Sequence, residues 1–402
     1  MTWPNPNNEL PKRSLKALME IFVVSVKLGL TSFGGPIAHL GYFHNEYIRK
    51  RQWMDERSYA DLVALCQFIP GPASSQVGIG IGTMRAGLLG GLIAWLGFTL
   101  PSVIALVVFA YVLTGLDISQ VGWIHGLKIV AVAIVAQAIL GMGQKLAPDK
   151  IRASIAIAVA VISLLWQSVF SQAALIISAG LMGLVISRNT EVQDAPALNV
   201  PITRTFAAFC LTLFFGLLIA LPILRHHSSS EWVALFDSFY RSGSIVFGGG
   251  HVVLPILEQE VVPPGWISKE DFLAGYGAAQ AVPGPLFTFA AYLGAMTKGV
   301  FGAILATIAI FLPAFLLILG TLPFWSALRN NRHIGAALVG INAAVVGILL
   351  AALYNPLWTT AIIDSADFAL ASILFLLLVF WKLPPWTIVM AGMIGGTLLE
   401  LF

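Results

Sequence analysis

The sequence predicts an all-α polytopic membrane protein made of two homologous halves in an inverted-topology repeat, with broken or re-entrant helices at FGG and PGP motifs. Three observations predict this class: an apolar composition, an internal repeat, and opposite charge in the two copies of one loop. The 402 residues are 58% hydrophobic and 10% charged, with a mean hydropathy of +0.88. A water-soluble fold of this size could not bury so much apolar surface.

The internal repeat pairs residues 29–105 with residues 243–317. The spacing between matched anchors is nearly constant, 214 residues at FGG and 212 at the last proline. The matched anchors are Phe33-Gly34-Gly35 with Phe247-Gly248-Gly249, Glu46 with Glu260, Trp53 with Trp266, Gln67 with Gln280, Pro70-Gly71-Pro72 with Pro283-Gly284-Pro285, and Pro101 with Pro313. Chance rarely keeps so many Gly, Pro, Trp and Gln anchors in one order.

We expect three parts along the chain: an N-terminal half (1–187), a linker with one extra span (188–228), and a C-terminal half (229–402). Each half has an apolar segment ending at FGG, a polar loop, an apolar segment broken by PGP, and four further runs long enough to span a bilayer. These runs are 86–113, 121–144, 151–168 and 171–187 in the first half, and 299–323, 334–354, 361–381 and 386–402 in the second. The extra run, 206–224, inverts the second half if each half crosses an even number of times.

Charge placement indicates the same inversion, because Lys and Arg concentrate in short cytoplasmic loops. The loop between FGG and PGP is basic in the first copy and acidic in the second. It carries Arg49, Lys50, Arg51 and Arg57 in the first, and Lys269 with Glu258, Glu260, Glu270 and Asp271 in the second. We therefore expect a cytoplasmic N-terminus and an external C-terminus. Because basic residues also precede the first apolar segment, the FGG and PGP segments are interpreted as half-membrane elements, which gives about 9 full spans, or 13 if every segment crosses.

The helix breaks are the candidate substrate site, since paired broken helices form the site in transporters with inverted repeats. Pro72 fits the first helical position, so the free N–H groups of Ala73, Ser74 and Ser75 would face an anion at the positive end of the helix dipole. Thr288 supplies the hydroxyl in the second copy. The candidate substrate-binding residues are Phe33, Gly34, Gly35, Gln67, Pro70, Gly71, Pro72, Ser74, Ser75, Phe247, Gly248, Gly249, Gln280, Pro283, Gly284, Pro285 and Thr288. The alternative is that the Gly and Pro residues are only kinks or packing points.

Five charged residues are candidates for charge compensation or proton coupling, because charge inside a membrane segment is costly. They are Lys27, Glu46, Arg85, Lys128 and Glu260. Arg85 could instead snorkel to the interface, and the two glutamates could simply solvate their loops. The two cysteines lie in apolar segments and the seven histidines are scattered, so we expect no disulfide framework, metal site or cofactor.

The motifs resemble the chromate ion transporter family in its long two-domain form, over almost the whole chain. The resemblance is carried by Phe33-Gly34-Gly35-Pro36, His44-Asn45-Glu46-Tyr47, Trp53 and Gln67-Phe68-Ile69-Pro70-Gly71-Pro72, with Phe247-Gly248-Gly249-Gly250-His251 and Gln280-Ala281-Val282-Pro283-Gly284-Pro285 as the second copy. It implies an exporter of chromate in the bacterial cytoplasmic (inner) membrane, giving chromate resistance, driven by the proton motive force and competed by sulfate. Chromate or sulfate, protons and membrane lipids are the implied partners, and a homodimer is a possible assembly.

Three alternatives stay open at this point. The substrate could be sulfate or another oxyanion, because chromate and sulfate are tetrahedral dianions of similar size. A passive anion channel would need no alternating access. A membrane enzyme, such as a chromate reductase or lipid-phosphate hydrolase, is disfavoured because no nucleophile dyad is recognisable. We expect no nucleic-acid partner and, without a phosphate-loop motif, no ATP-driven transport. The second copy lacks the Ser74-Ser75 pair after PGP, so the two copies are not assumed to contribute equally.

Overall fold

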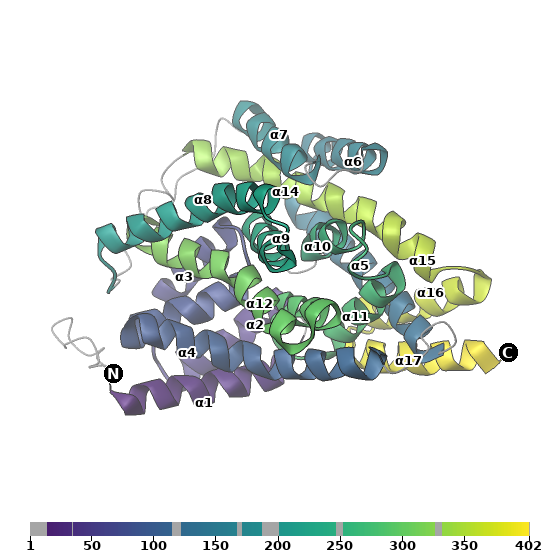
Figure 1. The fold of residues 1–402 in the computed structure, drawn as a ribbon, viewed down its shortest axis with the longest axis horizontal. Coiled ribbons are helices and arrows are strands. Elements are labelled where there is room, and N and C mark those ends of the chain that lie inside the picture. Colours follow the sequence, from purple (N-terminus) through teal and green to yellow (C-terminus); the bar gives the residue numbers. More distant parts are fainter. Residues whose placement is uncertain are drawn as a thin grey trace.

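The computed structural model describes residues 14–33, 35–114, 122–166, 171–186, 201–246, 252–325 and 332–401. Within these ranges all regular structure is helical, which confirms the predicted all-α class (Figure 1). The first half contains α1 (Leu15–Thr31), α2 (Gly35–Phe43), the π-helix η1 (His44–Lys50), α3 (Glu56–Phe68), α4 (Ala73–Thr114), α5 (Gly122–Leu146), α6 (Lys150–Leu165) and α7 (Ser171–Ile186). The next helix, α8 (Arg204–His227), is the predicted extra span.

The second half repeats this order of elements. It contains α9 (Glu231–Ile245), α10 (Val253–Val261), α11 (Lys269–Ala281), η4 (Leu286–Thr288), α12 (Phe289–Thr321), η5 (Leu322–Phe324), α14 (Arg332–Ala352), η6 (Leu353–Trp358), α15 (Thr359–Ala361), α16 (Ser365–Val379) and α17 (Pro385–Leu401). By the sequence repeat, α9 to α12 correspond to α1 to α4. The opposite orientation of the two halves in a membrane remains a prediction.

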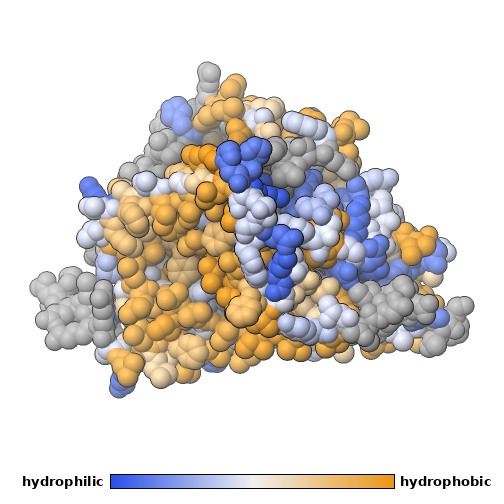
Figure 2. Space-filling view, in the orientation of Figure 1, coloured by the Kyte–Doolittle hydropathy of each residue, from blue (hydrophilic) through white to orange (hydrophobic). Residues whose placement is uncertain are grey.

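Within the described residues, five helical segments are long and apolar enough to cross a membrane: 73–114, 122–144, 204–227, 286–324 and 335–361. Two shorter apolar helices cover 174–186 and 365–379. The protein is therefore a multi-pass membrane protein. Figure 2 shows a broad hydrophobic surface over the part of the molecule that holds α4, α8 and α12. Large side chains of α8 such as Phe209, Phe215 and Ile219 are exposed, as expected for side chains that face lipid.

Both long helices that follow PGP turn back on themselves. The helical dihedrals of α4 fail at Ala86–Gly87, and those of α12 fail at the matching Lys298–Gly299. A Cβ atom on Gly82 would overlap the carbonyl oxygen of Gly90, although eight residues of continuous helix would separate them by about 12 Å. The chain after the break therefore folds back against the chain before it.

The chain also reverses at each PGP turn. Helices α3 and α11 have 13 residues each, about 20 Å of helix, which is shorter than the hydrocarbon core of about 30 Å. Leu62 of α3 packs on Gly80 of α4, and the Tyr292 hydroxyl of α12 donates to the carbonyl of Asp271 in α11 at 2.8 Å. Helices α3 and α11 therefore pack against the helices that follow them, and their re-entry into a membrane stays a prediction.

The two halves interlock through close helix contacts. Helix α5 packs along α17, and α14 packs along α7 and α6. Glycines permit the approach: a Cβ atom on Gly126 would overlap the carbonyl oxygen of Gly392, and one on Gly183 would overlap a carbonyl oxygen of α14. Helices α4 and α12 also pack on each other, with the Trp95 ring 5.7 Å from the Phe311 ring.

Candidate functional site at the paired helix breaks

The two PGP turns are joined to the opposite half by a reciprocal pair of backbone hydrogen bonds. The Gly71 N–H donates to the carbonyl of Val246 at 2.7 Å, and the Gly284 N–H donates to the carbonyl of Ser32 at 2.9 Å. Ser32 and Val246 are equivalent positions, each directly before an FGG motif. The PGP turn of each half thus lies against the end of the helix that precedes FGG in the other half.

Both turn glycines adopt backbone conformations that L side chains rarely adopt, with φ of +118° at Gly71 and +104° at Gly284. Each turn also contacts the long helix of the other half. The Ser102 hydroxyl of α4 donates to the Pro283 carbonyl at 2.6 Å, whereas the equivalent Ala314 of α12 lies beside Gly71. The turns are therefore held by matched contacts with different chemistry.

Gln76 pairs with a backbone carbonyl that the first break leaves without a helical partner. Its Nε2 atom donates to the Pro70 carbonyl at 2.8 Å. Sequence reasoning proposed Gln67 for this task or for contact with substrate, but the Gln67 side chain is exposed. Its counterpart Gln280 is partly buried and hydrogen-bonds Tyr276. Nothing in the sequence alone distinguishes Gln67 from Gln76, because both lie within two turns of PGP.

Polar side chains gather at the breaks of the first half. His39 is 1% exposed, and its Nδ1 atom lies 3.2 Å from the Ser74 hydroxyl at the start of α4. The imidazole also hydrogen-bonds the backbone of Ser32. Ser32, Ser75 and Gln76 are buried, and the Ser32 Oγ, Ser75 Oγ and Gln76 Oε1 atoms have no hydrogen-bond partner among the described residues.

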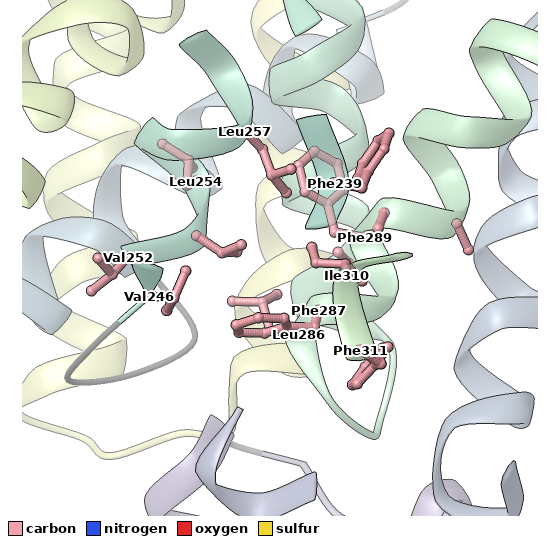
Figure 3. Packing of buried hydrophobic residues seen from close by; sticks show 14 of the residues in the cluster. Phe239, Val246, Val252, Leu254, Leu257, Leu286, Phe287, Phe289, Ile310 and Phe311 are labelled. Atoms are coloured by element: carbon pink, nitrogen blue, oxygen red, sulfur yellow. The ribbon is translucent and has the colours of Figure 1, made fainter. Parts of the chain in front are cut away.

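Apolar side chains occupy the same positions in the second half. The counterparts of Ser32, His39, Ser74, Ser75 and Gln76 are Val246, Val253, Phe287, Thr288 and Phe289. All five are at most 2% exposed. Figure 3 shows Val246, Phe287 and Phe289 packed with neighbours from α9, α10 and α12. The one polar member, Thr288, donates its hydroxyl to the Pro285 carbonyl at 2.7 Å.

The remaining candidates at the breaks are only partly described. The Phe33 ring lies 6.3 Å from the Trp386 ring of α17, and Gly35 has φ of +76° at the start of α2. Pro72 and Pro285 directly precede the first helical residues after each turn, so Pro72 lies one position before the first helical position predicted for it. Gly34, Phe247, Gly248 and Gly249 lie outside the described residues.

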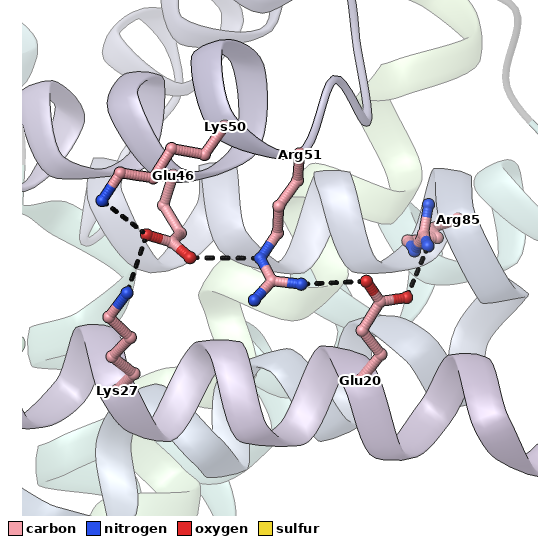
Figure 4. Close-up of polar contacts among 6 residues, drawn as sticks. All are labelled: Glu20, Lys27, Glu46, Lys50, Arg51 and Arg85. Atoms are coloured by element: carbon pink, nitrogen blue, oxygen red, sulfur yellow. Dashed lines mark hydrogen bonds and ion pairs between the residues drawn. The ribbon is translucent and has the colours of Figure 1, made fainter.

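The charged candidates of the first half form a network away from the PGP turn. Lys27 Nζ lies 3.1 Å from Glu46, which also accepts from Arg51 at 3.1 Å. Arg51 continues to Glu20 at 2.9 Å, and Glu20 pairs with Arg85 at 2.7 Å. Figure 4 shows Glu20 and Lys27 extending from α1 toward the residues of η1 and α4. The network thus ties α1 to both of these elements.

One alternative for these residues is wrong in this conformation. Glu46 and Glu260 do not solvate their loops, because they are 5% and 6% exposed. The Arg85 guanidinium stacks 4.2 Å from the Trp53 ring centroid and pairs with Glu20. The sequence could not reveal this burial, because the partners come from helices distant in sequence.

The second half has a matching network with residues that sequence reasoning missed. Arg241 contacts Glu260 at 2.8 Å and Asp237 at 2.8 Å, and Arg225 lies 3.2 Å from Asp237. Arg241 is the counterpart of Lys27 at the same 214-residue spacing as Glu260 and Glu46. This constant spacing is the signal in the sequence that could have identified Arg241. Lys128, the last charged candidate, lies on α5 and interacts with the carboxylates of α11.

A profile of the family described as chromate transporter matches residues 19–184 and 233–397. This chain belongs to the chromate transporter family. The two matched regions correspond to the two halves and leave out the linker and α8. Family membership supports a role in chromate transport and agrees with the resemblance found in the sequence.

Three relatives of this chromate transporter extend over most of its length. It is 29% identical over 395 residues to a probable chromate transport protein of Synechococcus elongatus, covering 96% of each chain. It is 27% identical to a chromate transport protein of Cupriavidus metallidurans, covering 96% of this chain and 93% of the relative. A chromate transport protein of Pseudomonas aeruginosa is 27% identical over 82% of this chain and 79% of its own length. No solved structure matches.

The two glutamates of this chromate transporter differ in their titration. Burial disfavours the charged form of Glu46 and so tends to raise its pKa. The hydrogen bonds from Lys27 and Arg51 outweigh this effect, and the pKa of Glu46 is lowered. Burial raises the pKa of Glu260, although Arg241 and Arg225 oppose this shift. Asp237 adds to it by like-charge repulsion. Glu260 is therefore the more readily protonated of the two.

Proposed function

We propose that this protein exports chromate across the bacterial cytoplasmic membrane as a secondary active transporter driven by the proton motive force. The observation that supports this most strongly is the reciprocal pair of hydrogen bonds from Gly71 and Gly284. These bonds join the broken segment of each half to the other half in a protein of the chromate transporter family. In transporters built from repeats, such breaks line the substrate site.

The chemistry at the first break suits a tetrahedral dianion. Helix α4 begins at Ala73, so its first N–H groups and the positive end of its dipole lie at the turn. The hydroxyls of Ser74 and Ser75 add donors at the same helix end. Together these groups can replace part of the water shell of chromate without a fixed cation. Sulfate has the same shape and charge, so it should compete.

Alternating access requires the site to open on each side in turn. In this conformation Ser74 and Ser75 are each 1% exposed, so the structure corresponds to a closed state. We propose that the halves lie in opposite orientations, with the N-terminus cytoplasmic and the C-terminus outside. The reciprocal hydrogen bonds would then separate when the halves move relative to each other to admit the anion.

Proton coupling is assigned to the second-half network. Glu260 is buried beside Asp237 and shares Arg241 with it. Protonation of Glu260 removes one of the two carboxylates that Arg241 contacts, which weakens the contact between α9 and α10. A proton that enters from outside could in this way change the conformation of the second half while chromate leaves.

The test is uptake of labelled chromate into everted membrane vesicles, with and without a proton uncoupler. We expect uphill accumulation that sulfate reduces and the uncoupler abolishes. Gly71→Val should insert into the membrane but fail to transport, because a β-branched residue cannot adopt the conformation at this turn. Accumulation that the uncoupler leaves unchanged would refute proton coupling, and flux only down the gradient would indicate a channel. If vesicles take up sulfate but no chromate, the substrate assignment is wrong.

A further inference from the structure

The two sets of helix breaks have the same backbone but opposite side-chain chemistry. We define the first-half cradle as the set Ser32, His39, Ser74, Ser75 and Gln76. We propose that the oxyanion is bound by this cradle alone, with His39 as the residue that positions the Ser74 hydroxyl. This inference rests on the proposed function and names which half supplies the binding groups.

The cradle is a single structure, as its contacts show. His39 bridges the two broken-helix ends of its half, since its imidazole reaches the backbone of Ser32 after α1 and the hydroxyl of Ser74 in α4. The Ser32 carbonyl also accepts from Gly284. A line of contacts therefore joins the first half's breaks to the PGP turn of the second half.

Three buried polar atoms of the cradle have no protein partner among the described residues. They are the Ser32 and Ser75 hydroxyls and the Gln76 carbonyl oxygen, on residues at most 1% exposed. The two hydroxyls can donate to an anion, whereas the Gln76 oxygen can only accept and would pair with a water or with a hydroxyl of the cradle. The Gln76 amide lies over the PGP turn, because its Nε2 atom is 2.9 Å from where a Gly71 Cβ would stand. Unpaired buried polar groups are costly unless a ligand or water pairs with them. Hydroxyls at a helix N-terminus pair well with an anion.

The second half cannot supply the same donors. Four of its five equivalent positions are Val or Phe, and the hydroxyl of Thr288 is engaged by the Pro285 carbonyl. These side chains pack into the apolar core of α9 to α12 (Figure 3). At these positions the second half therefore contacts the first-half breaks through the backbone of Val246 and Gly284 and not through side-chain donors.

The His39 ring is fixed by its surroundings. It stands edge-on to the Phe98 ring at 87°, with the centroids 5.5 Å apart. A neutral imidazole has one donor and one acceptor nitrogen, so contact with Ser74 sets which way the hydroxyl hydrogen points. With the hydrogen on Nδ1, His39 donates to the Ser74 oxygen, which leaves the Ser74 hydroxyl hydrogen free to donate to the anion.

The experiment uses the full-length protein in proteoliposomes, with chromate binding and transport measured for matched variants in the two halves. Ser75→Ala removes a cradle hydroxyl, and Thr288→Val removes its second-half counterpart. We expect Ser75→Ala to raise the Kd and KM for chromate at least about tenfold, because a hydrogen bond to a charged group is lost. Thr288→Val should leave both constants within about twofold. Equal effects of the two variants would overturn the proposal.

His39 is tested with His39→Val, which copies the second-half residue, and His39→Asn, whose amide nitrogen occupies about the place of Nδ1. We expect His39→Val to raise KM more than it lowers kcat, and His39→Asn to restore most of the affinity. No change in KM for His39→Val would refute its positioning role. Failure of the wild-type protein to bind or transport any oxyanion would instead refute the proposed function, so the two failures are distinguishable.

Discussion

The PGP turns give a quantitative prediction, because Gly71 and Gly284 have the same strained backbone and different neighbours. In Gly284→Ala the new Cβ would overlap the Ser102 hydroxyl. The backbone strain should cost about 1–3 kcal/mol. Displacement of Ser102 should also break its 2.6 Å bond to Pro283, which adds about 0.5–1.5 kcal/mol.

The matched control is Gly71→Ala. Its Cβ would meet the flexible end of Gln76 at 2.9 Å and the methyl of Ala314 at 3.5 Å. A shift of Gln76 strains its 2.8 Å bond to the Pro70 carbonyl, but the overlap with Gln76 is smaller than the overlap with Ser102 in Gly284→Ala. Gly71→Ala should therefore destabilise the protein less than Gly284→Ala, by up to about 1.5 kcal/mol. The free energy of unfolding is measured by SDS titration in mixed micelles, with the helix content monitored spectroscopically.

A double-mutant cycle with Ser102→Ala isolates the clash. If Ser102 is already truncated, Gly284→Ala should add only the strain of the backbone. The double variant should therefore be more stable than the sum of the single costs by about 0.5–1.5 kcal/mol. Strict additivity of the two costs would refute the contact between Gly284 and α4, and with it the convergence of the breaks.

The remaining predictions concern the charge networks and the reversal within α4. The pKa of Glu260 is raised and that of Glu46 is lowered, so Glu260 takes up a proton before Glu46 does as the pH falls. Glu260→Gln should therefore abolish the acceleration of export by external acid. Glu46→Gln should keep this acceleration. Arg241→Ala leaves two buried carboxylates, Asp237 and Glu260, with Arg225 as their remaining shared partner, and should cost up to about 3–5 kcal/mol of stability in SDS titration. Lys27→Ala removes a half-exposed cation and should cost less than about 1 kcal/mol. Equal costs would contradict the difference in burial. Gly82→Val should prevent the close contact across the break and abolish the correctly folded fraction in detergent size-exclusion chromatography, so a normal monodisperse peak would contradict that packing.

The sequence was sufficient to predict the repeat and the location of the helix breaks. Gly71 and Gly284 are recognisable because each lies between two prolines in an apolar segment at matched positions. Proline and glycine constrain the backbone locally, so their effect can be inferred without tertiary contacts. The extra span α8 could be inferred from its length and composition alone.

Contacts between the halves were not predictable in the same way. The hydrogen bond from Gly284 to Ser32 depends on the packing of α4 and α12, which no local pattern specifies. The burial of Glu46 likewise depends on Lys27 and Arg51 meeting around it. The difference between His39 and its counterpart Val253 was present in the sequence, but its meaning required knowledge that position 39 faces Ser74.

The most direct test of an anion site at the converging breaks is to locate bound chromium. Crystals of the protein grown with chromate, measured at the chromium absorption edge, should show anomalous density between the PGP turns, within hydrogen-bond reach of Ser74 and Ser75 at the start of α4. Density confined to Lys128, or to the surface groove beside Glu20 and Arg51, with none between the turns, would contradict the account.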